Sequence, residues 1–130
     1  MGIDPAYGSS SIGIMITQFV DGQVQIQRAE ECKRPDINEM LSKAWVLLLE
    51  HLVQKIYIDG ASPSFIKSLK LYWGERHDYE NVPKEHKRFM KVEPVNFNQE
   101  HKEMVGHCKM LLERGYITIN PVFDKLITSL

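Results

Sequence analysis

Three strand-like segments precede the first helix pattern of this chain, and this order constrains its fold more than any other feature. Segment 12–19 places Ile12, Ile14 and Ile16 on one side, and segment 24–28 also alternates apolar and polar residues, as half-buried strands do. Asp21-Gly22, between the two segments, is a strong two-residue hairpin signal. Together with a short strand at Gly2-Ile3-Asp4, the beginning of the chain predicts a three-stranded antiparallel meander.

Helix and strand patterns alternate after the meander. Asp36 and Glu39 form a capping-box pattern that predicts a helix to near Gln54, and a short strand at Lys55–Asp59 follows. Ser62-Pro63 predicts the start of a second helix, which we expect to end near Leu71 before a loop at 74–88. The remaining expected elements are a strand at 89–95 that Pro94 stops, a helix capped by Asn98, a strand at 116–119 and a helix from Val122. Met104, Val105, Cys108, Leu111 and Leu112 form the expected buried stripe of the third helix. This order predicts an α/β fold with a mixed sheet flanked by helices, and it is the element order of the ribonuclease H-like fold.

Length and composition predict a single domain with its own core. The chain has 130 residues, of which 43% are hydrophobic, and its net charge is -1, so the composition is not that of a disordered chain. The longest apolar run, 44–49, has six residues, whereas a membrane-spanning helix needs about 20. We therefore expect no membrane association.

Charge is unevenly distributed along the chain. Residues 1–66 carry a net charge of -3, whereas residues 67–91 carry a net charge of +3. A basic segment can contact a phosphate backbone, although a solvated loop of mixed charge gives the same pattern. The candidate DNA-binding residues in this segment are Lys67, Lys70, Arg76, Lys84, Lys87 and Arg88.

Several common catalytic motifs are absent from the sequence. It contains no phosphate-binding P-loop, no G-x-S-x-G nucleophile motif and no H-E-x-x-H zinc motif. Cys32 and Cys108 do not form a disulfide framework, and reduced thiols are the better expectation.

Two aspartates stand at the ends of predicted strands, where Asp is unusual. Asp4 follows Gly2-Ile3, and Asp59 ends the strand that starts at Lys55. Each could serve only to form a turn. If the first and fourth strands lie side by side and parallel, however, the two carboxylates meet, and a cation between them would relieve their repulsion. Hard oxygen ligands suit Mg²⁺ or Mn²⁺.

The sequence around both aspartates resembles the nuclease domain of viral, phage-type terminase large subunits. Two segments show the resemblance, namely residues 2–14, Gly-Ile-Asp-Pro-Ala-Tyr-Gly-Ser-Ser-Ser-Ile-Gly-Ile, and residues 57–66, Tyr-Ile-Asp-Gly-Ala-Ser-Pro-Ser-Phe-Ile. Later segments match the same pattern, namely 92–97 with 101–104, 111–115 and 117–119. Holliday-junction resolvases begin with a motif similar to the first one, and actin-like ATPases and sugar kinases begin with a similar strand, Asp and Gly-Ser turn. A resolvase-like nuclease and a noncatalytic docking or nucleotide-binding module therefore remain alternatives.

The resemblance implies an endonuclease that cuts double-stranded concatemeric DNA by a two-metal mechanism during DNA packaging. It implies that Asp4 and Asp59 are catalytic metal ligands. The family's third ligand normally comes from a His-Asp-Asp-like segment that this sequence does not contain. We interpret Asp124 as a helix-capping residue and do not give it that role. The resemblance therefore implies a domain spanning 1–130 that is truncated at its C-terminus, with weak activity or none on its own.

The same resemblance implies the partners and the compartment. The full-length protein would carry an N-terminal ATPase domain and would act with a small terminase subunit and a portal in the host cell cytoplasm. The basic residues named above would guide the duplex backbone toward Asp4 and Asp59.

Overall fold

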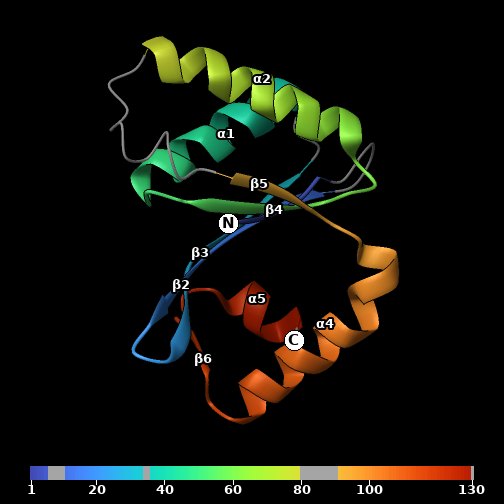
Figure 1. Cartoon of the computed structure of the whole chain (residues 1–130). Coiled ribbons are helices and arrows are strands. Elements are labelled where there is room, and N and C mark those ends of the chain that lie inside the picture. The colour runs from blue at the N-terminus through green and yellow to red at the C-terminus, as the bar shows by residue number, and fades with distance from the viewer. Residues whose placement is uncertain (6–10, 34–35, 80–90, 130) are drawn as a thin grey trace.

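A mixed six-stranded sheet forms the centre of the computed structural model, which describes residues 1–5, 11–33, 36–79 and 91–129 (Figure 1). The strand order is β5-β4-β1-β2-β3-β6. The elements are β1 (Gly2–Asp4), β2 (Ser11–Val20), β3 (Gln23–Lys33), α1 (Ile37–Glu50), β4 (Lys55–Asp59), α2 (Pro63–Tyr79), β5 (Lys91–Val95), α4 (Phe97–Glu113), β6 (Ile117–Ile119) and α5 (Asp124–Ser129). The predicted α/β class and the mixed, helix-flanked sheet are confirmed.

The hairpin of β2 and β3 forms where the sequence predicts it. Asp21 and Gly22 have φ values of 50° and 77°, the left-handed conformation that a two-residue hairpin turn of this kind requires. Val20 therefore pairs with Gln23, and the antiparallel ladder extends to Ser11 and Lys33. The meander is completed by β1, which pairs antiparallel with β2.

The other strands are parallel to their neighbours. β1 pairs with β4, β4 pairs with β5, and β3 pairs with β6, each in the parallel direction. The sequence did not predict which edge of the sheet the last strand joins. Pro94 lies inside β5 and does not end it, because β5 is an edge strand and the missing N–H of proline is tolerated there.

The hydrophobic core fills one face of the sheet, the face that α1 and α2 cover (Figure 1). Ile3, Ile14 and Ile58 point to this face and are at most 4% exposed. The rings of Trp45 in α1 and Trp73 in α2 lie 6.3 Å apart in a tilted arrangement. We call the face of the sheet that α1 and α2 cover the closed face. The opposite face, which α4 and α5 approach, is the open face.

Several helix predictions need correction. α1 ends at Glu50 instead of near Gln54, because Leu52 has a left-handed conformation with φ of 48°, and α5 begins at Asp124 instead of Val122.

α2 continues to Tyr79 instead of ending near Leu71, because fully buried Trp73 extends the apolar face one turn beyond Leu69. Asn96, not Asn98, caps α4, and its side chain accepts a hydrogen bond from the Gln99 N–H at 3.3 Å.

The predicted buried stripe of α4 is also wrong. Val105 is 53% exposed and Cys108 is exposed, while Leu111 and Leu112 are only half-buried. The stripe is present in the sequence, but α4 stands beside the open face without packing closely against it.

Among the described residues, no helix is long and apolar enough to cross a membrane.

We expect core packing between α1 and the sheet to dominate stability. Leu48→Ala should lower the free energy of unfolding by about 2–5 kcal/mol, because Leu48 is fully buried and its truncation leaves a cavity. Val46→Ala in the same helix is the matched control, since Val46 is 57% exposed and should change stability by less than about 0.5 kcal/mol. Urea unfolding followed by circular dichroism measures both, and equal losses would contradict this description of the core.

Candidate metal centre

The parallel pairing of β1 with β4 brings Asp4 and Asp59 together. Ile3 pairs with Ile58, so the two aspartates are the next residues on neighbouring strands, whose backbones lie about 4.8 Å apart. Successive side chains of a strand point to opposite faces. Because Ile3 and Ile58 are buried in the closed face, Asp4 and Asp59 both point to the open face. The predicted juxtaposition is therefore present in the structure.

A third carboxylate lies in the same row across the sheet. Asp4 pairs with Gly13 of β2, and Gly13 pairs with Glu31 of β3, so Glu31 shares the open face with the aspartates. Glu31 stands two strands from Asp4, roughly 10 Å in backbone spacing. Gly13 between them has no side chain, and a Cβ there would approach only the Asp4 Cβ, at 3.9 Å. Glu31 is not among the site residues predicted from the sequence.

A tight turn holds Asp59 in place. Its Oδ1 accepts a hydrogen bond from the Ala61 N–H at 3.0 Å, and its backbone carbonyl accepts one from the Ser62 N–H at 3.1 Å. The Gly60 N–H donates to the Val95 carbonyl at 2.8 Å, and a Cβ on Gly60 would lie only 3.2 Å from that oxygen. Asp59 therefore has the turn-forming role that its sequence context allows, and this turn orients its carboxylate.

The row of carboxylates borders a cavity of about 830 Å³ on the open face. One wall is the sheet, and the other consists of residues from α4, α5 and the turn before α5. Asp124 lies in this second wall, across from Asp4 and Asp59. Its Oδ1 accepts a hydrogen bond from the Lys125 N–H at 2.8 Å in the first turn of α5, which agrees with a role at the helix start.

In the part of the chain that the structure describes, no three acidic, His or Cys side chains lie close enough to hold a metal ion together.

Glu31 is held by two partners. The Ser11 hydroxyl donates a hydrogen bond to the carboxylate, and the Lys125 Nζ lies 3.1 Å from its Oε2. Both interactions favour the charged form and lower the pKa of Glu31 below its ordinary value. Lys125 thus neutralises the carboxylate that is furthest from the aspartate pair.

The predicted DNA-binding residues that the structure describes lie on the other layer of the molecule. Lys67 and Lys70 are exposed on α2, which covers the closed face. The Arg76 guanidinium stacks over the Tyr72 ring at 3.8 Å from its centroid. The sheet therefore separates these cations from the aspartates. The other three candidates, Lys84, Lys87 and Arg88, lie outside the described residues.

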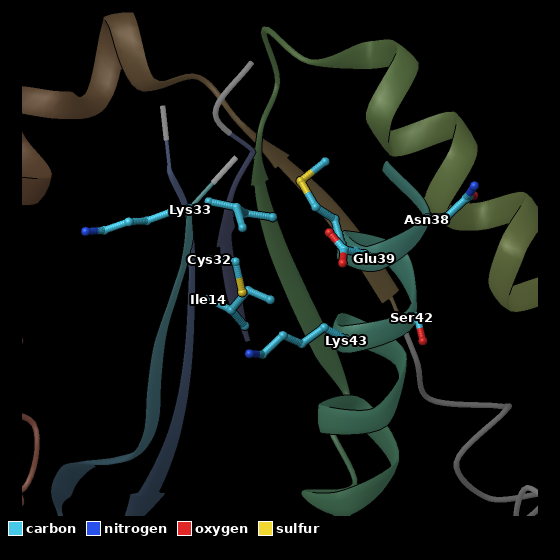
Figure 2. A pocket seen from close by; sticks show the side chains of 9 residues that line it. Ile14, Cys32, Lys33, Asn38, Glu39, Ser42 and Lys43 are labelled. Carbon is cyan, nitrogen blue, oxygen red and sulfur yellow. The ribbon is translucent and has the colours of Figure 1, made fainter. Parts of the chain in front are cut away.

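A second cavity of about 650 Å³ lies between α1 and the ends of β2 and β3 (Figure 2). Figure 2 shows Cys32 of β3 and Lys43 of α1 reaching the same space. Lys43 forms an ion pair with Glu30, which is the main cause of its raised pKa. Glu39, the carboxylate of this cavity, accepts a hydrogen bond from the Asp36 N–H in the α1 capping box. Lys43 and Glu39 therefore have structural partners, and the lining of this cavity includes neither Asp4 nor Asp59.

Comparison of the chain with protein-family models, with curated proteins and with solved structures finds no match.

The two partners of Glu31 predict how its carboxyl titrates. Ser11→Ala and Lys125→Met should each raise the pKa of Glu31 toward the ordinary value of 4.5. Because the pKa is lowered in the folded state, the stabilisation from Glu31 is present above pH 4.5 and is lost as the pH falls through the folded value. Carboxyl ¹³C NMR titration measures the shift.

Lys109→Met is the control for this titration. Lys109 is as exposed as Lys125 (76% against 77%), but it pairs with Glu113 on α4. It should leave the Glu31 titration unchanged. An unchanged Glu31 pKa in Ser11→Ala and Lys125→Met would mean that neither partner holds the carboxylate in solution.

Proposed function

We propose that this chain is a metal-dependent endonuclease domain that hydrolyses phosphodiester bonds of DNA. The observation that carries the proposal is the position of Asp4 and Asp59 at the ends of adjacent parallel strands, on one face and beside one cavity. Two carboxylates so close repel each other, and a bound cation removes that repulsion. The turn role of Asp59 accounts for one of its oxygens but not for the matching position of Asp4.

The donor set fits Mg²⁺ or Mn²⁺. Asp4 and Asp59 offer hard carboxylate oxygens, and the exposure of Asp4 lets water complete the coordination. A metal bound there supplies the Lewis acidity that hydrolysis of a phosphodiester requires. The chain's own contribution is to hold both carboxylates on a rigid sheet, with Asp59 oriented by the Ala61 N–H. A two-metal mechanism needs a further acidic ligand besides these two.

The fold supports the same proposal. The order β5-β4-β1-β2-β3, with β1 between an antiparallel and a parallel neighbour, agrees with the ribonuclease H-like arrangement that the element order predicts. In this proposal the domain belongs to a terminase large subunit that cuts double-stranded concatemeric DNA during packaging. An ATPase domain, a small terminase subunit and a portal in the host cytoplasm are then its partners.

The aspartates are the first test of this proposal. Asp4→Asn and Asp59→Asn should each reduce the weak Mn²⁺-dependent nicking of supercoiled plasmid expected of this chain to the background level, because the amide removes the charge that holds the metal. Titration calorimetry with Mn²⁺ should show the same loss of binding, which gives a readout that does not depend on catalysis.

Asp21→Asn is the matched control for the aspartate variants. Asp21 is exposed in the hairpin turn with φ of 50°, a conformation that Asn adopts easily. It should retain both nicking and Mn²⁺ binding. If all three variants bind Mn²⁺ as the unsubstituted chain does, Asp4 and Asp59 are not metal ligands.

The contribution of α2 to DNA binding is a separate prediction. Because α2 lies on the other side of the sheet from the aspartates, Lys67 and Lys70 can contact a duplex at the site only around the sheet edge where β4 ends and α2 begins, about 6 Å along the helix from Lys67. Lys67→Ala and Lys70→Ala should weaken duplex binding and each reduce the salt dependence by about one phosphate contact. Arg76→Ala should have a smaller effect, because its guanidinium already stacks on Tyr72. Fluorescence anisotropy across a salt series measures the duplex affinity and its salt dependence, with Lys109→Ala as the control. Equal salt slopes in all variants would exclude α2 from the DNA interface.

A further inference from the structure

The cavity beside Asp4 and Asp59 has an apolar lining that metal binding alone does not explain. Met15 and Tyr57 line it from the sheet, and Met104, Val122 and Leu126 line it from the other wall. Tyr57 is 42% exposed although it stands in the middle of β4. A large aromatic side chain therefore remains available to a ligand next to the carboxylates.

The register of the sheet gives Tyr57 open space on its β1 side, while its neighbour on the β5 side is Glu93, which pairs with Lys55. Tyr57 pairs with Gly2, which in turn pairs with Met15, so the neighbouring position on β1 has no side chain. A Cβ built on Gly2 would meet nothing within 4 Å. Tyr57 also precedes Asp59 by two residues, so the two side chains share the open face about 6.6 Å apart along the strand. A flat group lying on the tyrosine would be next to the aspartate pair.

The size and chemistry of the cavity indicate which part of a nucleic acid it takes. Its volume of about 830 Å³ is within the range of about 300–1,000 Å³ that is typical of small-molecule sites. A fully paired duplex presents charged phosphates and groove edges to a protein, and neither needs an apolar cavity. An unpaired nucleotide offers a flat base that stacks on aromatic side chains and a phosphate that can lie at the carboxylate-bound cation.

We propose that the cavity binds an unpaired nucleotide, with its base stacked on Tyr57 and its phosphate at the Asp4–Asp59 pair. This inference rests on the proposed nuclease function and names its substrate class, a DNA strand that is unpaired at the site of cleavage. Single-stranded, gapped or frayed DNA supplies such a strand directly. A closed duplex must first open locally, at the cost of unstacking.

Binding of a fluorescein-labelled single-stranded oligonucleotide in Ca²⁺ tests the proposal without requiring cleavage. We expect it to bind more tightly than a blunt duplex of the same sequence. Tyr57→Ala should weaken single-strand binding roughly tenfold, as loss of one stacked base does, and should leave duplex binding unchanged. Tyr57→Phe keeps the ring and should bind as the unsubstituted chain does, which separates stacking from a folding defect.

Tyr116→Ala is the matched control. Tyr116 is 46% exposed, close to the value for Tyr57, but it lies at the turn before β6 and does not line the cavity. It should not affect binding of either DNA. Equal losses in Tyr57→Ala and Tyr116→Ala, or equal affinity of the unsubstituted chain for single strand and duplex, would overturn the inference.

Plasmid nicking distinguishes this failure from failure of the proposed function. If Tyr57→Ala binds single strands normally while Asp4→Asn still abolishes Mn²⁺-dependent nicking, the nuclease proposal stands and the unpaired-nucleotide site is wrong. If the unsubstituted chain binds none of these DNAs and also binds no Mn²⁺, both are wrong.

Discussion

The parallel ladder between β1 and β4 is the constraint on which the candidate site depends. β1 has only three residues, and its register is fixed by the pairs Gly2 with Tyr57 and Ile3 with Ile58. A slip of β1 by one residue would turn Ile3 to the open face and Asp4 into the core. Burial of an unpaired carboxylate is costly, and loss of a buried isoleucine adds to that cost. The packing of the closed face therefore also sets the position of the aspartates.

The two faces of the sheet consequently have different roles. The closed face is filled by isoleucines and by the Trp45 and Trp73 rings between α1, α2 and the strands. On the open face, the last part of the chain is attached through the parallel pairing of β6 with β3, and the exposed ion pair of Lys125 with Glu31 is a further link to the sheet. This arrangement leaves α4 largely exposed and a cavity between it and the sheet. The core on the closed face therefore provides most of the packing, and the open face retains a cavity.

Local sequence signals predicted the elements well and the long-range register only in part. The Asp21-Gly22 turn, the capping box of Asp36 and the bounds of β4 are set by neighbouring residues, and all three are confirmed. Glu31 was missed for a physical reason. The hairpin turn alone would place Gly13 opposite Glu30, but a β-bulge near Ile16 shifts the ladder by one residue. A bulge has no strong sequence signature, so the third carboxylate of the row is visible only in the folded sheet. The exposure of the α4 stripe likewise depends on packing that periodicity does not report.

The apolar lining and the carboxylates of the open face act on each other. Apolar walls lower the local dielectric constant, which strengthens both the repulsion between Asp4 and Asp59 and their attraction for a cation. Lys125 does not relieve this repulsion, because its ammonium is held at Glu31, two strands away from Asp4. In the proposed site, a ligand that covers the cavity would exclude water and so strengthen the attraction of Asp4 and Asp59 for a cation. Occupation of the apolar cavity and binding of the metal should therefore be cooperative, with each increasing the affinity for the other by the same factor.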